Sequence, residues 1–177
     1  PFVLVQHETT AALMAVVCGE LTGSCGACIS IMGTGAINLA GGAIYAFLER
    51  HPLLCITETY GINGAPLMSI QKIDHGATFA PYCKDEITLG ADDPGRQIDA
   101  AIRLAMAERP GPIHVDYPQS MDGGAPARSV ARASEAPSRP EGNLEAIANE
   151  IDRAEKPIII AGPVVLRQRA ESELLRL

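Results

Sequence analysis

Residues 26–57 read GACISIMGTGAINLAGGAIYAFLERHPLLCIT, and the pattern of this stretch decides the class of fold. An apolar run over 26–31 ends at the turn Gly33-Thr34-Gly35, a helical pattern follows over about 36–50, and a second apolar run covers 53–57. Neither run alternates apolar with polar residues, which is typical of parallel strands that are covered on both faces. We therefore predict a strand–helix–strand unit within a parallel sheet.

Strand and helix patterns alternate on both sides of this unit. Further apolar runs predict strands at 2–5, 87–89 and 113–117, and further helical patterns predict helices at 7–22 and 94–108. The first helix is apolar almost all round, so we expect it to be buried on most faces. A weakly patterned segment over 58–86 is expected to be a loop with one helical turn. Together these elements predict an α/β fold with three layers, α/β/α, around a parallel sheet.

Residues 119–142 differ from the rest of the chain because they are rich in Ala, Ser, Pro, Gly and Arg and almost lack large apolar residues. This composition is typical of an interdomain linker. The residues after it contain an amphipathic helix, a very apolar run over 157–161 that predicts a strand, and a last helical pattern. We therefore expect a domain over 1–118, a linker over 119–142 and the incomplete start of a second α/β domain over 143–177.

The composition limits the partners of the protein. The 177 residues are 47% hydrophobic and 20% charged, as in folded globular proteins, and the net charge of −7 disfavours nucleic acid and anionic lipid as partners. No apolar run reaches the ~20 residues that span a bilayer, and no signal-peptide pattern is present, so we expect no membrane partner. Five cysteines, an odd number with several inside apolar runs, indicate a reduced, cytoplasmic protein.

Glu8 lies where the first predicted strand enters the apolar helix. A carboxylate at a helix N-terminus is stabilised by the free backbone N–H groups there, so Glu8 can be an ordinary first-turn residue. It also follows the carboxyl end of a predicted parallel strand, which is where open α/β sheets bind their ligands. Because an almost unbroken apolar helix follows, we expect Glu8 to be poorly solvated and its pKa to be raised.

The glycine turn at Gly33 and Gly35 admits more than one interpretation. It is similar to the fingerprint of a dinucleotide-binding domain of an oxidoreductase, with Glu58 at the end of the next strand as the ribose-binding acid. Asn38 replaces the third fingerprint glycine, so a tight turn that allows close backbone packing explains the pattern equally well. A third hypothesis is a non-catalytic α/β interaction module in which Glu8 only caps a helix.

The remaining candidate residues have weaker patterns. The Cys25–Cys28 motif has no second cysteine pair and runs into an apolar stretch, so we interpret it as packing. His51, His75 and His114 lack the spacing of metal ligands and are interpreted as structural, so no metal ligand is predicted. The segment from Gln71 to Lys84 is either a functional loop or a surface excursion.

From Val5 to Pro118 the order and spacing of these features resemble the pyrimidine-binding domain of thiamine-diphosphate-dependent enzymes of the acetolactate synthase, pyruvate oxidase and benzoylformate decarboxylase type. The matching pieces are His7-Glu8, Gly33-x-Gly35-x-x-Asn38, Gln71-x-x-Asp74, Pro81-x-x-Lys84 and Gly111-Pro112-x-His114-Val115-Asp116-x-Pro118. Residues 154–162 resemble the start of the central domain of the same family.

The resemblance implies a role for the matching residues. Glu8 would be catalytic, because its carboxylate would hydrogen-bond a ring nitrogen of the cofactor aminopyrimidine and favour the imino tautomer. Gln71 would lie on the substrate side of the cofactor. Besides Glu8, the cofactor-binding residues would be those of the wall against the ring: Gly33, Thr34, Gly35 and Asn38. Thr34 stands where the family usually carries proline, which leaves the role of Glu8 unchanged and the exact substrate open.

The resemblance also implies the wider reaction. The substrate would be a small-molecule 2-keto acid, decarboxylated with carboligation as in acetolactate synthases. Thiamine diphosphate would be the cofactor, with Mg²⁺ bound by a domain absent from this chain and FAD as an option in the full-length protein. A second subunit of a homodimer or homotetramer would complete the active site. The first domain would lack its N-terminal strand and helix, and these 177 residues alone would be inactive.

Overall fold

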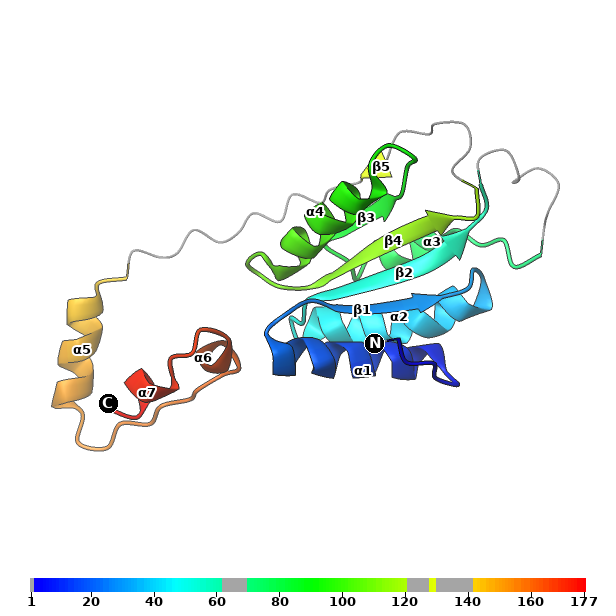
Figure 1. Cartoon of the computed structure of the whole chain (residues 1–177). Helices are drawn as coiled ribbons and strands as arrows, with labels where there is room; N and C mark the ends of the chain where they lie inside the picture. Colours follow the sequence, from blue (N-terminus) through cyan, green and yellow to red (C-terminus); the bar gives the residue numbers. More distant parts are fainter. Residues whose placement is uncertain (1, 62–69, 121–127, 130–141) are drawn as a thin grey trace. The chain divides into compact units, whose positions relative to one another are not determined.

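The computed structural model describes residues 2–61, 70–120, 128–129 and 142–177 (Figure 1). The chain divides into two compact units, Pro1–Ser134 and Glu135–Leu177. Most of the predicted linker over 119–142 lies outside the described residues. Within the described residues, no helix is both long enough and apolar enough to cross a membrane.

The first unit is built on a sheet with the strand order β1-β2-β4-β3-β5. Four of its strands are parallel: β1 (Gly26–Ser30), β2 (Leu53–Thr59), β4 (Pro112–Pro118) and β3 (Asp85–Thr88). The short β5 (Arg128–Ser129) pairs antiparallel with β3. The strands predicted for this unit are confirmed, except the one at 2–5, and their ends differ by at most two residues.

Helices cover both faces of this sheet, which confirms the predicted three-layer α/β/α arrangement (Figure 1). The helices among the described residues of the first unit are α1 (Glu8–Thr22), α2 (Thr34–Leu48), α3 (His75–Phe79) and α4 (Pro94–Met106). Leu53 and Cys55 of β2 pack with α1, α2 and Phe79 of α3. Leu54 points to the opposite face because side chains alternate along a strand, and it packs in the cluster that α4 completes.

Local interactions set the ends and the packing of α1. His7 is its N-cap, and Nδ1 of His7 accepts a hydrogen bond of 3.2 Å from the backbone N–H of Thr9. Gly23 ends the helix with φ 66°, a left-handed conformation that glycine adopts without strain. Gly42 of α2 allows a close approach of the two helices, because a Cβ there would lie 2.1 Å from the Cβ of Ala12. The hydroxyl of Thr9, in the first turn of α1, also donates a hydrogen bond to the backbone carbonyl of Asn38, so this turn lies against the first half of α2.

Two predicted strands are wrong. Residues 2–5 form no strand, and Leu4 is 86% exposed. Residues 157–161 are also irregular, and Ile160 is 93% exposed. An apolar run becomes a strand only where a neighbouring strand completes its backbone hydrogen bonds, and neither run has such a neighbour in the part of the chain that the structure describes.

The burial expected of two further elements is also wrong. The buried residues of α1 are Ala12, Val16 and Gly19, whereas Val17 and Leu21 are exposed, so the helix is not buried on most faces. β1 alternates buried and exposed residues instead of being covered on both faces, and Ile29 is half exposed. The reason is that β1 lies at the edge of the sheet, while α4 packs against β2 and β4.

The second unit contains the predicted amphipathic helix α5 (Leu144–Arg153), which begins after the N-cap Asn143. The side chain of Asn143 accepts a hydrogen bond of 3.1 Å from the backbone N–H of Ala146. The last helical pattern of the chain forms two short helices, α6 (Val164–Arg167) and α7 (Glu171–Leu174), rather than one.

Candidate functional site

Glu8 opens α1 and contacts α2. Its Oε2 atom accepts a hydrogen bond of 3.0 Å from Nδ2 of Asn38, which lies 30 residues further along the chain. Glu8 is half-buried and Asn38 is exposed, so the pair is open to a ligand from solution. The structure thus brings together two of the residues for which the sequence resemblance predicted a shared site.

The protonation of Glu8 differs from the sequence expectation. Its pKa lies below the ordinary value of 4.5, first because its own backbone N–H hydrogen-bonds the carboxylate and second because Asn38 does. Burial acts in the opposite direction and is the smaller effect. The predicted rise of the pKa is therefore wrong, because the hydrogen bonds to the carboxylate outweigh the effect of burial. Glu8 is ionised near neutral pH.

The two glycines of the turn allow other parts of the chain to approach closely. A Cβ on Gly35 would lie 3.3 Å from Oε1 of Glu8 and 2.8 Å from Cγ1 of Ile31, so the absent side chain leaves room for the carboxylate. Gly33 has φ 70° and ψ −117°, a conformation that other residues rarely adopt. A Cβ on Gly33 would lie 2.4 Å from the Cβ of Gln71. The turn therefore contacts Gln71 through one glycine and Glu8 through the other.

Thr34 and Gln71 lie at the edges of this arrangement. Thr34 is exposed at the first position of α2. Gln71 borders an open pocket of about 130 Å³ whose lining residues are Met32, Thr59, Tyr60, Gln71, Lys72, Ile73 and His75. The predicted substrate-side residue is thus adjacent to the glycine turn, and its role stays a prediction.

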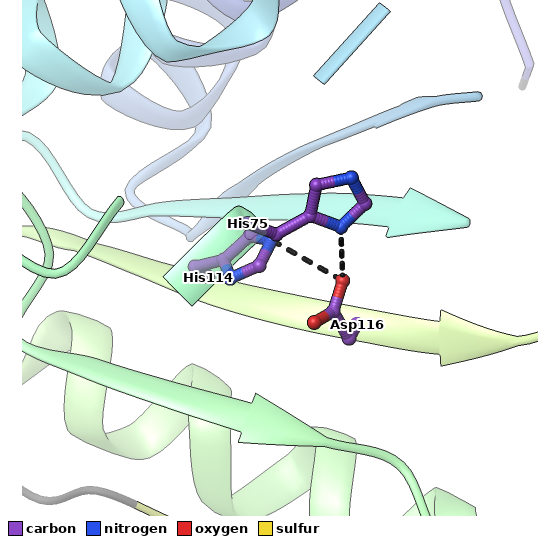
Figure 2. A group of neighbouring side chains, drawn as sticks. All are labelled: His75, His114 and Asp116. Carbon is purple, nitrogen blue, oxygen red and sulfur yellow. Dashed lines mark hydrogen bonds and ion pairs between the residues drawn. The ribbon is translucent and has the colours of Figure 1, made fainter. Parts of the chain in front are cut away.

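A cluster of buried polar residues, which the sequence analysis did not bring together, lies next to the same turn. It comprises Thr57 of β2, His75 of α3, and His114 and Asp116 of β4. Nδ1 of His75 lies 2.7 Å from Oδ1 of Asp116, and Nε2 of His114 lies 3.7 Å from the same oxygen (Figure 2). The hydroxyl of Thr57 donates to Oδ1 of Asp116 at 2.8 Å and lies 2.8 Å from Nε2 of His114. We call these four residues the His75 cluster.

Part of this cluster is visible in the sequence. His114 and Asp116 are two residues apart in a strand, so their side chains point to the same face. The pairing of Thr57 with Asp116 then follows from the register of β2 and β4. His75 could not be placed in this way, because only tertiary packing brings α3 to β4.

His114 is the residue of the cluster most affected by burial. It is fully buried, and its ring stacks on Phe79 with the centroids 4.1 Å apart. The pKa of His114 is lowered to about 4, and burial is the largest cause. Asp116 acts to raise this pKa and His75 acts to lower it. Its Nδ1 has no hydrogen-bond partner among the described residues and lies 3.9 Å from Oε1 of Glu86. His114 is therefore neutral at physiological pH.

The other candidates from the sequence have different surroundings. Nδ1 of His51 lies 2.7 Å from Oε1 of Glu20. Burial raises the pKa of Cys25 to about 11, which supports a packing role for the Cys25–Cys28 motif. Glu58, the acid that the dinucleotide interpretation requires, accepts a hydrogen bond of 2.9 Å from Nε2 of Gln119.

The glycine turn follows the carboxyl end of β1, where open parallel α/β sheets bind their ligands. Residues 1–78 match the family described as "Thiamine pyrophosphate enzyme, N-terminal TPP binding domain". The matched range contains Glu8, the glycine turn, Asn38 and Gln71. This match supports the predicted resemblance of the first unit to the N-terminal domain of thiamine-diphosphate-dependent enzymes.

Similar proteins carry acetolactate synthase names. The chain is 31% identical over 162 residues to "Acetolactate synthase, catabolic" of Raoultella terrigena, an alignment that covers 89% of this chain and 29% of that protein. It is 28% identical over 185 residues to "Probable acetolactate synthase large subunit" of Methanocaldococcus jannaschii, an alignment that covers 99% of this chain and 31% of that protein. It is also 28% identical over 179 residues to "Acetolactate synthase large subunit" of Corynebacterium glutamicum, and this alignment covers 97% of the chain and 29% of that protein. The chain thus spans about three tenths of the length of these curated relatives.

Proposed function

We propose that the protein carrying this chain is a thiamine-diphosphate-dependent enzyme that decarboxylates a 2-keto acid and joins the product to a second carbonyl compound. The observation that carries this proposal is the hydrogen bond between Asn38 and Glu8 beside Gly35, inside the matched range. The acetolactate synthase names of the relatives support the choice of substrate class.

The residues present fit the aminopyrimidine ring of thiamine diphosphate. Asn38 hydrogen-bonds Oε2 of Glu8, while Oε1 lies on the side of Gly35. A Cβ on Gly35 would fill space beside that oxygen, so glycine keeps room for a flat ring next to a carboxylate. A carboxylate is also the group suited to share a proton with a ring nitrogen. When bound, thiamine diphosphate supplies a nucleophilic carbon and an electron sink.

The role of Glu8 follows from its surroundings. In the free protein its backbone N–H and Asn38 stabilise the charged form and lower its pKa. With a ring packed against it, the Glu8 carboxylate would lose water, which would disfavour its charge and raise its pKa toward the range where it can share a proton. Asn38 fixes Oε2, so the proton is held on the side of the glycine turn.

The proposal extends to parts of the site that this chain does not contain. The diphosphate and Mg²⁺ would be held by residues outside the chain, and a second subunit of a homodimer or homotetramer would complete the site. The proposal includes FAD as an optional cofactor of the full-length protein. The five cysteines are free thiols, which supports a reducing, cytoplasmic compartment. On this proposal the 177 residues alone convert no substrate.

Thermal unfolding of the natural protein that contains this chain tests the cofactor. Thiamine diphosphate with Mg²⁺ at about 100 times Kd should stabilise the folded state by about 2.7 kcal/mol. The same protein should then consume pyruvate, used as the probe 2-keto acid, and release a carboligation product. Stabilisation by NAD but not by thiamine diphosphate would favour the dinucleotide interpretation of the glycine turn. FAD is added alone and together with thiamine diphosphate, to test for FAD binding. No stabilisation by thiamine diphosphate would overturn the proposed function.

A further inference from the structure

Gly33 is the N-cap of α2, and its buried backbone N–H needs a hydrogen-bond acceptor. Its carbonyl accepts the first bond of the helix from the backbone N–H of Ile37 at 3.0 Å, but the N-cap has no side-chain bond of its own. The backbone N–H of Gly33 is buried and donates to Nε2 of His75 at 3.3 Å. Because a buried N–H without a partner is costly, His75 is the side chain that satisfies this turn.

This bond assigns the tautomer of His75. An Nε2 atom that accepts a hydrogen bond carries a lone pair, so the proton of the neutral ring is on Nδ1. Nδ1 lies 2.7 Å from Oδ1 of Asp116, which accepts that proton in a hydrogen bond (Figure 2). Asp116 also accepts from the Thr57 hydroxyl. A chain of hydrogen bonds thus runs from the carboxylate of β4 through His75 to the backbone of the glycine turn.

The donor and acceptor roles of these atoms also argue against a metal ion in the His75 cluster. The ligand atoms of His75, His114 and Asp116 lie within 4.8 Å of one another, a spacing that three metal ligands can have. A metal on Nδ1 of His75 would place the ring proton on Nε2, where it would face the N–H of Gly33 as a second donor. The Thr57 hydroxyl also lies within 3.3 Å of Nδ1 of His75 and 2.8 Å of Asp116. The donors and acceptors therefore match a hydrogen-bond network.

We propose that His75, held in its tautomer by Asp116, is a positioning residue that sets the glycine turn for the cofactor; the role rests on the proposed function. His75 lies four residues after Gln71, which packs against Gly33, so one ring joins the turn and the Gln71 segment to β4. Gly35 lies two residues after Gly33 and beside Glu8. A shift of the turn therefore moves the surface next to the carboxylate without removing any group that touches the cofactor.

Two substitutions of His75 separate positioning from general stability. In His75→Gln the side-chain oxygen reaches the place of Nε2 and can still accept from Gly33. In His75→Asn the side chain reaches only the place of Nδ1, so it can donate to Asp116 but leaves Gly33 without its acceptor. In the natural protein, His75→Asn should weaken thiamine diphosphate binding about tenfold, because the turn relaxes in the free protein to satisfy the Gly33 N–H and binding must restore it at the cost of one unsatisfied buried N–H. His75→Gln should stay within about threefold of the unaltered protein.

The matched control is His51→Gln, a histidine at the other end of β2, which should leave thiamine diphosphate binding unchanged. Equal loss of affinity in the Gln and Asn variants of His75 would contradict the proposal, since both remove the ring but only one removes the acceptor. Binding of Zn²⁺ to the unaltered protein that is lost in His75→Gln would also contradict it, because it would show a metal site instead.

The tautomer can be measured without cofactor or activity. Nitrogen NMR of the natural protein labelled at histidine should show His75, assigned from its disappearance in His75→Gln, with a protonated Nδ1 and an unprotonated Nε2. A protonated Nε2 would overturn the role of His75 while leaving the proposed function intact. Absence of thiamine diphosphate binding in the unaltered protein would instead overturn the proposed function and, with it, the role of His75.

Discussion

The burial of His114 predicts a specific pH dependence of folding. Its pKa of about 4 in the folded protein lies below the ordinary 6.5, so between these values the unfolded chain binds a proton that the folded chain does not. Stability from this residue is therefore complete above pH 6.5 and is lost as the pH falls toward 4. The shift corresponds to a loss of about 2 kcal/mol between pH 7 and pH 5 and about 3 kcal/mol by pH 4.

The charged and titratable groups that face His114 belong to the same network. Asp116 acts to raise its pKa, His75 acts to lower it, and Oε1 of Glu86 lies 3.9 Å from its Nδ1. The substitution His114→Phe removes the titrating ring but keeps an aromatic surface for the stack on Phe79, whose centroid lies 4.1 Å away. It leaves the hydrogen bond from Thr57 to Asp116 in place.

Urea unfolding of the natural protein and of His114→Phe at pH 7, 6, 5 and 4 measures this effect. The difference in unfolding free energy between the two proteins should change by about 2 kcal/mol from pH 7 to pH 5, because only the unaltered protein carries the histidine. Parallel pH dependences for the unaltered protein and His114→Phe would refute the reasoning.

Two further predictions concern Glu8, and a third concerns the packing of α1 against α2. Glu8 is ionised when free and loses water when a ring packs against it, so thiamine diphosphate binding near pH 5.5 should be accompanied by proton uptake that is absent in Glu8→Gln. Calorimetry in buffers of different ionisation enthalpy measures the uptake, and equal uptake in both proteins would contradict the account. Asn38→Ala should raise the pKa of Glu8 and shift the pH profile of cofactor binding upward, and an unshifted profile would show that Asn38 does not act through Glu8. Gly42→Ala should destabilise the first unit by about 1–3 kcal/mol in urea unfolding, because its Cβ would lie 2.1 Å from the Cβ of Ala12. Gly41→Ala is the control and should destabilise the unit less, because the atom nearest to its Cβ would be 3.4 Å away.

The sheet of the first unit was predictable because its strands are short apolar runs bounded by Gly and Pro, as at Leu53–Thr59 after Pro52. The runs at 2–5 and 157–161 have the same local pattern but no partner strand among the described residues. Strand formation depends on a neighbour, so periodicity alone could not tell these cases apart. The open face of β1 has the same cause, since the position of a strand within the sheet is a tertiary property.

The candidate site shows a similar division. The resemblance indicated Glu8, the glycine turn and Asn38 together, and the structure places them in contact. The pKa of Glu8 was predicted in the wrong direction, because an apolar sequence after a residue does not establish that water is excluded from it. The contact of His75 with Asp116 joins residues 41 positions apart through α3 packing, for which the sequence contains no local signal.

The most direct test of the central claim, that Glu8 activates the cofactor, is the rate of hydrogen–deuterium exchange at the thiazolium carbon of thiamine diphosphate bound to the natural protein. Glu8→Gln is nearly isosteric and should keep the fold, but it cannot exchange a proton with the ring nitrogen. We expect exchange in Glu8→Gln to be slower by a factor of about 10² or more, the usual contribution of a positioned acid–base group. An unchanged exchange rate in a folded, cofactor-loaded Glu8→Gln protein would contradict the account.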